Sequence, residues 1–185
     1  IEVMESGDSV VYIRFQDDIF FDSDEYYLRQ SAYPVLDVIG DAIHSVEDEI
    51  YIISINGHTA QVDDPNYAVS DWMLSSERAS SVAIYFEEEK QIDPQKMRPM
   101  GYGKNYPIAS NDTPEGRQKN RRVDIAIVKN SEGVVAGDME QVLQSLFDPT
   151  SFPTTGGVSD LFTPEGSVSS SQTEPETAQS SGEGV

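Results

Sequence analysis

Residues 57–78 read GHTAQVDDPNYAVSDWMLSSER, and this stretch decides how the chain folds. It continues a nearly unbroken apolar run, Ile50 to Ile55, which is typical of a strand buried on both faces of a sheet. A polar loop runs from Gly57 to Asp71, and a helical pattern of apolar residues follows it. The stretch therefore predicts a strand, a loop and a helix that packs on the sheet. Its loop is a candidate binding site.

The predicted helix carries one charged residue on its apolar side. At 100° per residue, Arg78 falls in the same sector as Leu74, Ser75, Ala79, Val82, Tyr85 and Phe86. In one interpretation, its guanidinium group escapes to water or pairs with Asp63, Asp64 or Asp71. In the other, Arg78 faces a shallow pocket and holds a ligand carboxylate with two parallel hydrogen bonds. The residues alone leave both interpretations open.

The rest of the chain supplies the other expected elements of one domain. Strands are predicted at Val10–Phe15, Met97–Tyr102 and Arg122–Val128, and a helix at Ser31–Val46. The segment Lys104–Asn120 is rich in Asn, Pro and Gly and is expected to be mostly loop. We expect a linker at 1–9 and the domain at 10–129.

The composition changes after Asn130. Residues 130–147 are expected to be a linker with one short amphipathic helix, Met139–Phe147, capped by Asp138. Residues 148–185 contain no Lys or Arg and are rich in Ser, Thr, Gly, Pro and Glu, so we expect a disordered acidic tail.

The charge and the residue types exclude several classes of function. A formal net charge of -21, from 33 acidic and 12 basic residues, argues against binding to nucleic acid or to an anionic membrane surface. The chain has no cysteine, which excludes disulfides and thiol chemistry. No apolar run approaches the ~20 residues that span a bilayer. Because the chain begins with Ile1, it is expected to be a processed or truncated piece with a possible anchor upstream.

Two further groups of residues are weighed as sites. His58 suggests a base or a metal ligand, but only two histidines exist, and we expect its ring nitrogens to brace the loop. No catalytic or nucleotide-binding motif occurs, so no enzyme activity, cofactor or metal is expected. The segment from Arg98 to Lys129 is locally basic, and Arg117 and Arg121 are secondary candidates for anion contact. Alternatively, these arginines pin the last strand to neighbouring acids.

Several separated motifs resemble the OmpA-like peptidoglycan-binding domain and, within it, the periplasmic part of the flagellar stator protein MotB. They lie between about Val10 and Val128, and they are Phe21-Asp22-Ser23, Ile55-Asn56-Gly57-His58-Thr59, Asp71-Trp72-Met73-Leu74-Ser75-Ser76-Glu77-Arg78-Ala79, Gly101-Tyr102-Gly103, Asn111-Asp112-Thr113, Gly116-Arg117 and Asn120-Arg121-Arg122-Val123.

The resemblance implies an α+β fold, a βαβαββ two-layer sandwich with helices on one face of a mixed four-stranded sheet. Its ligand would be the stem peptide of peptidoglycan, held through the carboxylate and amine of a diamino acid. Carried over by position, Arg78 binds the carboxylate, Thr59 lines the site, and Ser23 and Asp24 belong to the neighbouring loop. Ser75 is counted with the site.

The chain departs from the family pattern at two positions. The family's Asp after Gly-His-Thr is Ala60 here, so the usual amine-binding carboxylate is missing. Asp71 stands where the family usually has Asn and is a candidate to restore the charge, with Asp63 and Asp64 as weaker substitutes.

The resemblance also implies a setting outside the cytoplasm. It favours a wall anchor for a stator, with a MotA-like partner reached through a missing N-terminal transmembrane segment, and a homodimer. An OmpA-like or Pal-like tether is the alternative, as is an adaptor that has lost wall binding through Ala60.

Overall fold

The described part of the chain forms one mixed sheet. The computed structural model describes residues 1–6, 10–62 and 68–130, all within one compact unit, Ile1–Thr154. The strand order is β1-β2-β5-β3-β4, in which β3 and β4 are parallel and the other neighbours antiparallel. The strands are β1 (Glu2–Ser6), β2 (Val10–Gln16), β3 (Ile50–His58), β4 (Met97–Gly101) and β5 (Arg122–Lys129).

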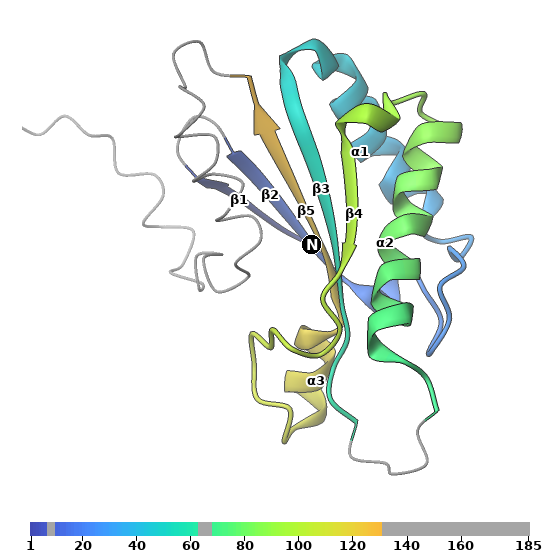
Figure 1. Cartoon of the computed structure of the whole chain (residues 1–185), viewed down its shortest axis with the longest axis vertical. Helices are drawn as coiled ribbons and strands as arrows, with labels where there is room; N and C mark the ends of the chain where they lie inside the picture. Colours follow the sequence, from blue (N-terminus) through green and yellow to red (C-terminus); the bar gives the residue numbers. More distant parts are fainter. Residues whose placement is uncertain (7–9, 63–67, 131–185) are drawn as a thin grey trace, which may run out of the picture. The chain divides into compact units, whose positions relative to one another are not determined.

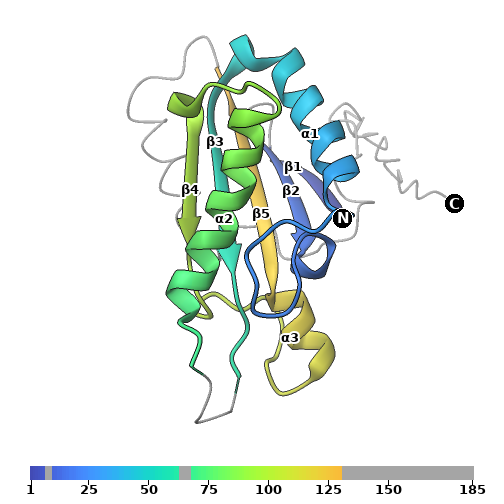
Figure 2. The same ribbon diagram turned by 90° about the vertical axis from the view of Figure 1, so that its right-hand side faces the viewer.

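The two long helices cover one face of this sheet. Both α1 (Tyr33–Ser45) and α2 (Asp71–Glu88) lie on the same side, while α3 (Pro114–Asn120) lies at the end where β5 begins (Figure 1). Figure 2 shows α1 and α2 in front of the strands. Short 3-10 turns follow β2 and precede β3 and β4, at Asp17–Ile19, Glu47–Glu49 and Pro94–Lys96. The predicted α+β sandwich is confirmed.

The structure differs from the sequence prediction at two places. The sheet has five strands instead of four, because residues 2–6, expected to be linker, pair with β2. Residues 114–120, expected to be loop, form α3, where the Thr113 hydroxyl accepts a hydrogen bond from the Gly116 amide at 3.1 Å. The predicted helix Met139–Phe147, the acidic tail and the residues Asp63 and Asp64 lie outside the described residues.

The main core lies between the sheet and the helices, and α2 approaches β3 very closely. Alternate side chains of the central strands point toward the helices, since side chains in a strand alternate between the two faces of the sheet. At Gly57 a Cβ atom would collide with the backbone carbonyl of Ser75 in α2. Glycine is therefore required at this position. The buried residues of this core include Phe15, Phe20, Leu36, Ile43, Ile53, Ile55, Val82, Phe86, Val123 and Ile125.

The opposite face of the sheet divides into a polar end and an apolar end. Toward the carboxyl end of β3, the buried residues are polar: Arg14, Asn56, His58, Arg122 and Asp124. Toward the other end they are apolar: Val10, Tyr12, Ile52, Ala126 and Val128, with Met4 packed against them. The polar end lies beside the candidate site.

Candidate functional site

A pocket of about 410 Å³ lies where the segment after β2, the residues after β3, α2 and the end of α3 meet. Six of the residues predicted for the site line it: Ser23, Asp24, Thr59, Ala60, Arg78 and Arg121. Asp71, Ser75 and Arg117 are not among its lining residues. Within residues 57–78, the lining residues are Thr59, Ala60, Val62, Leu74 and Arg78, while an acidic wall comes from Asp17–Asp24.

Arg78 forms a buried wall of this pocket, and it is tied to the segment that follows β2. Arg78 is 2% exposed, and its Nη1 lies 2.6 Å from Oδ2 of Asp17. Its Nε and Nη2 donate to the backbone carbonyls of Glu25, at 2.8 Å, and Asp22, at 3.2 Å. These bonds engage three of the five N–H donors of a guanidinium group. The other two make no hydrogen bond to a described residue.

The ion-pair partner of Arg78 differs from every candidate named from the sequence. Arg78 pairs with Asp17, whereas Asp71 contacts Thr59 and Lys104. Among the partners considered in the first interpretation, Asp71 is therefore not the partner, and Asp63 and Asp64 lie outside the described residues. Burial raises the pKa of the Asp17 carboxyl above its ordinary value, while the nearby Arg78 and Arg121 act in the opposite direction. No sequence signal distinguishes Asp17 from the adjacent Asp18. Only the folded structure shows that Asp17, and not Asp18, pairs with Arg78.

Asp71 lies behind the pocket wall and holds Thr59 in place. Its Oδ1 accepts a hydrogen bond from the Thr59 hydroxyl at 2.8 Å, and its Oδ2 lies 3.4 Å from Nζ of Lys104. Ser75 is fully buried and accepts a hydrogen bond from the Gly103 amide at 2.9 Å. Asp71 therefore positions the lining residue Thr59, and Ser75 positions Gly103, which follows β4. Neither Asp71 nor Ser75 is among the lining residues of the pocket.

The acidic residues that face the pocket come from the segment after β2. Asp18, Asp22 and Asp24 line it beside Asp17. Asp18 accepts a hydrogen bond from the side-chain amide of Gln118 at 3.0 Å, and Asp22 lies 3.4 Å from Nε of Arg29. Asp24 has a φ of 57°, which places it in the left-handed region that favours Asn, Asp and Gly. This acidic wall and Ala60 line the same pocket.

The predicted secondary arginines have separate roles. Arg121 lines the pocket, and its Nε lies 3.9 Å from Oδ1 of Asp17. Arg117 instead donates from Nη1 to the carbonyl of Asn111 at 2.6 Å, within the loop that precedes α3. Arg121 therefore adds positive charge to the pocket and contacts an acid, whereas Arg117 bonds to a backbone carbonyl and not to a neighbouring acid.

His58 belongs to the polar network beneath the site. Its ring stacks on Tyr102 with a centroid distance of 5.1 Å, and neither ring nitrogen hydrogen-bonds to a described residue. The expectation that ring nitrogens brace the loop is therefore wrong, since stacking does this. Burial and the charge of Arg122 lower the pKa of His58 to about 3, so the ring is neutral at physiological pH.

The centre of that network is Asp124, which lies between two arginines. Its carboxylate accepts hydrogen bonds from Nε of Arg14 and Nε of Arg122, both at 2.9 Å. Burial raises the pKa of Asp124, but Arg122 and Arg14 lower it by more, so the net pKa lies below the ordinary value. Asp124 therefore stays ionised as a structural anion.

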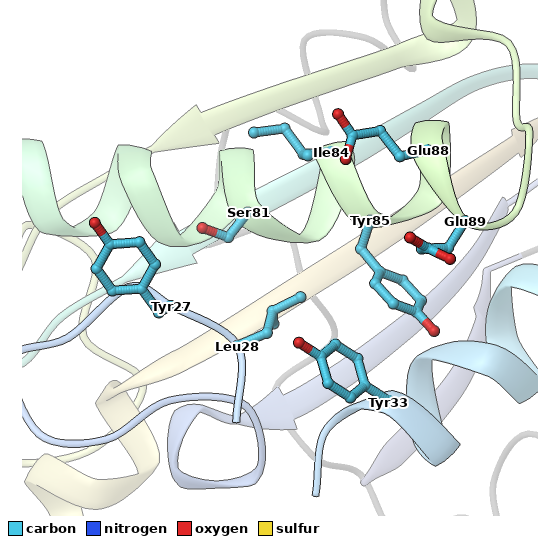
Figure 3. Close-up of a pocket in the computed structure, with 8 residues that line it drawn as sticks. All are labelled: Tyr27, Leu28, Tyr33, Ser81, Ile84, Tyr85, Glu88 and Glu89. Atoms are coloured by element: carbon cyan, nitrogen blue, oxygen red, sulfur yellow. The ribbon is translucent and has the colours of Figure 1, made fainter. Parts of the chain in front are cut away.

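A second pocket, of about 460 Å³, lies farther along α2 and has a different chemistry (Figure 3). Tyr27 lies at one end of it and the stacked rings of Tyr33 and Tyr85 at the other, with Glu88 and Glu89 nearby. Its lining contains no basic residue. Of these two pockets in the described part of the chain, the one with Arg78 has cationic side chains in its lining and the other has none.

Residues 1–6, 10–62 and 68–130 contain no candidate for either of two other kinds of site. No helix there has both the length and the apolar character needed to cross a membrane. Within the same residues, no three His, Cys, Asp or Glu side chains are grouped so as to hold a metal ion.

Curated relatives match about three fifths of the chain. Outer membrane protein A of Bordetella avium is 40% identical over 114 residues, which cover 62% of this chain and 56% of that protein. Motility protein B of Bacillus subtilis is 36% identical over 117 residues, which cover 63% of this chain and 44% of that protein. The chain thus spans about half the length of these relatives.

Solved structures have the same fold. The cell wall anchor of the type VI secretion system (T6SS) from Pseudomonas aeruginosa has a TM-score of 0.61 at 25% identity, covering 70% of this chain and 87% of that one. The periplasmic domain of Helicobacter pylori MotB has a TM-score of 0.60 at 23% identity, covering 78% and 91%. The model of the OmpA family matches residues 20–121, which is more than half of the chain. The chain therefore belongs to the OmpA family.

Proposed function

We propose that this domain binds the stem peptide of peptidoglycan without catalysis and anchors a MotB-like stator subunit to the cell wall. The observation that carries the proposal is Arg78, a buried cation in a pocket wall with two N–H donors left for a ligand carboxylate. A carboxylate bound there would gain charge-assisted hydrogen bonds in surroundings sheltered from water.

The acidic wall supplies a place for the amine of the same diamino acid. Asp18, Asp22 and Asp24 line the pocket with Arg78, so opposite charges face one cavity. In this proposal they replace the carboxylate that Ala60 lacks, and Asp71 contributes by holding Thr59. A ligand that carries both an ammonium and a carboxylate group matches such a pocket through charge complementarity.

The relatives support the location and the role. The Pseudomonas aeruginosa structure is a cell wall anchor, and the Helicobacter pylori structure is a periplasmic domain. On the likeness to motility protein B, we also propose an extracytoplasmic location, a MotA-like partner and a homodimer. They are parts of the same proposal.

The binding step is tested by co-sedimentation with purified sacculi. In Arg78→Lys, the lysine keeps a positive charge beside Asp17 but loses the planar fork that matches a carboxylate. We expect at least about a tenfold loss of binding, equivalent to about 1.4 kcal/mol. The matched control is Arg98→Lys on β4, whose Nη1 donates to the carbonyl of Gln95 outside the pocket. Equal retention of both variants would reject Arg78 as the carboxylate site.

A tether that joins a membrane to the wall is the second candidate, and the 40% identity to outer membrane protein A favours it. The two are separated by replacing the matching region of Bacillus subtilis motility protein B with residues 1–147 and scoring swimming. Restored swimming supports the stator role. Sacculus binding without swimming supports the tether, and loss of both supports an adaptor.

A further inference from the structure

The apolar end of the second sheet face requires a cover that the described elements do not supply. Among the described residues, α1 and α2 lie on the other face, and α3 lies at the opposite end of β5 (Figures 1 and 2). Even so, the apolar residues of this end are at most 8% exposed. They are Val10, Tyr12, Ile52, Ala126 and Val128, and we call them the apolar row.

The apolar row lies where the chain leaves the sheet. Val128 pairs with Val10 of β2 on one side and with Ile52 of β3 on the other, so these three side chains cross the sheet in a line. β5 ends at Lys129, directly after Val128. The amide of Asn130 donates to the carbonyl of Glu49 at 2.6 Å, which fixes the point of departure. The next residues thus start beside the row.

The sequence beyond that point contains a segment that matches the row in pattern and size. Met139, Val142, Leu143, Leu146 and Phe147 recur at helical spacing, while Glu140, Gln141, Gln144 and Ser145 occupy the other side. A helix of nine residues is about 13.5 Å long. Three neighbouring strands span about 10 Å between the outer two axes. One such helix therefore suffices to cover the row.

The intervening chain is long enough to bring this segment back. Residues 131–138 number eight and reach at most about 28 Å when fully extended. The return across the sheet is shorter than that. A segment of the same chain is also present at a high effective concentration, an advantage that a separate molecule lacks.

We propose that residues 139–147 dock as a helix on the apolar row, with Leu143 and its apolar neighbours against Tyr12, Ile52 and Val128. The domain then has helices on both faces of its sheet. This inference does not depend on peptidoglycan binding.

The first test compares two glutamate substitutions in the full chain. Leu143→Glu places a charge on the apolar side of the segment, and Gln144→Glu places the same charge on the polar side. We expect Leu143→Glu to shift the urea midpoint to lower concentration and to increase the fluorescence of a dye that binds exposed apolar surface. Gln144→Glu should change neither. Equal behaviour of the two variants would overturn the proposal.

The second test locates the segment directly. Since the chain has no cysteine, Gln141→Cys carries a single nitroxide label. Amide signals of Tyr12, Ala126 and Val128 should lose intensity, whereas that of Ile84 in α2 should keep it. A label at Ser180→Cys is the control and should spare all four. Unchanged signals with the Gln141→Cys label would refute the docking.

The label test also distinguishes docking within one chain from docking of a second copy. In a mixture of unlabelled isotope-enriched chain and nitroxide-labelled chain without isotope, loss of the Tyr12 signal arises only between molecules. We expect no loss. A loss there would show that another copy covers the row and would overturn docking within one chain.

Discussion

Nη1 of Arg78 lies 2.6 Å from Oδ2 of Asp17, so the cation proposed to bind the ligand already has an anion of its own. The two residues are 61 positions apart, one in α2 and the other directly after β2. Their pairing joins the helix to the segment that carries the acidic wall. Mutations of Arg78 therefore change the fold as well as the ligand site, and the tests must separate the two effects.

The Arg78–Asp17 pair is expected to behave as a buried ion pair. Arg78→Leu alone leaves Asp17 without its main partner and should lower the free energy of unfolding by about 3–5 kcal/mol. The double variant Arg78→Leu with Asp17→Leu removes both charges and should recover part of this loss. Urea denaturation measures both. If the double variant is no more stable than the single one, the pairing is not what stabilises this region.

Restoring the carboxylate that the family has at position 60 should strengthen binding. Ala60 lines the pocket with Arg78, so Ala60→Asp brings a negative charge toward the ligand amine. We expect about a tenfold gain in sacculus binding, equivalent to about 1.4 kcal/mol. Ala60→Asn has the same shape without the charge and serves as the control. A gain with Asn but not with Asp would contradict amine recognition.

Two substitutions of Asp71 distinguish its role in holding Thr59 from a role as the charge that binds the ligand amine. Asp71→Asn retains an oxygen that accepts the Thr59 hydroxyl, whereas Asp71→Ala removes it. If Asp71 acts by holding Thr59, sacculus binding should survive in Asp71→Asn and fall in Asp71→Ala. A fall of the same size in both variants would restore Asp71 as the compensating charge.

His58 should make the stability of the domain depend on pH. Its pKa falls from 6.5 to about 3 on folding, so the unfolded chain takes up a proton at a pH where the folded chain does not. Stability is therefore complete above pH 6.5 and decreases below it, by about 1.4 kcal/mol per pH unit, until the folded pKa is reached.

The control is His58→Phe, which keeps a ring to stack on Tyr102 and removes the titration. Unfolding free energies at pH 7 and pH 5 should differ less in this variant than in the natural chain. The acidic residues of the chain contribute equally to both proteins in that comparison. The same pH dependence in both would exclude His58 as its source.

Much of the fold follows from local patterns in the sequence. The apolar run at β3, the sector of α2 and the alternation in β5 predict a sandwich because each pattern must bury one face. β1 and α3 were not predicted, and each has a physical reason. β1 is an edge strand whose pairing with β2 is set by the sheet, and α3 has seven residues without an apolar period. Its helix depends on the Thr113 cap.

The sequence singles out one residue of the candidate site, Arg78, and misses its ion-pair partner. Arg78 was found because a charge in an apolar sector is a conflict that a sequence shows. Its partner Asp17 was not, because a contact across 61 residues leaves no mark on local periodicity. The same holds for Asp71, whose place behind Thr59 results from the close approach of α2 to β3 at Gly57. The partners of Arg78 and Asp71 are set by how closely the helix and the strands pack in the folded domain.

The pairing of β1 with β2 determines how the domain responds to tension. Glu2 lies opposite Arg14, so Ile1 is at the same end of the sheet as Asp17 and the pocket. A force between Ile1 and a ligand in the pocket would part β1 from β2 one residue pair at a time, beginning where Arg14 contacts Glu2 at 3.7 Å. Under load, β1 would peel away first, lengthening the chain while the ligand stays bound to an intact pocket.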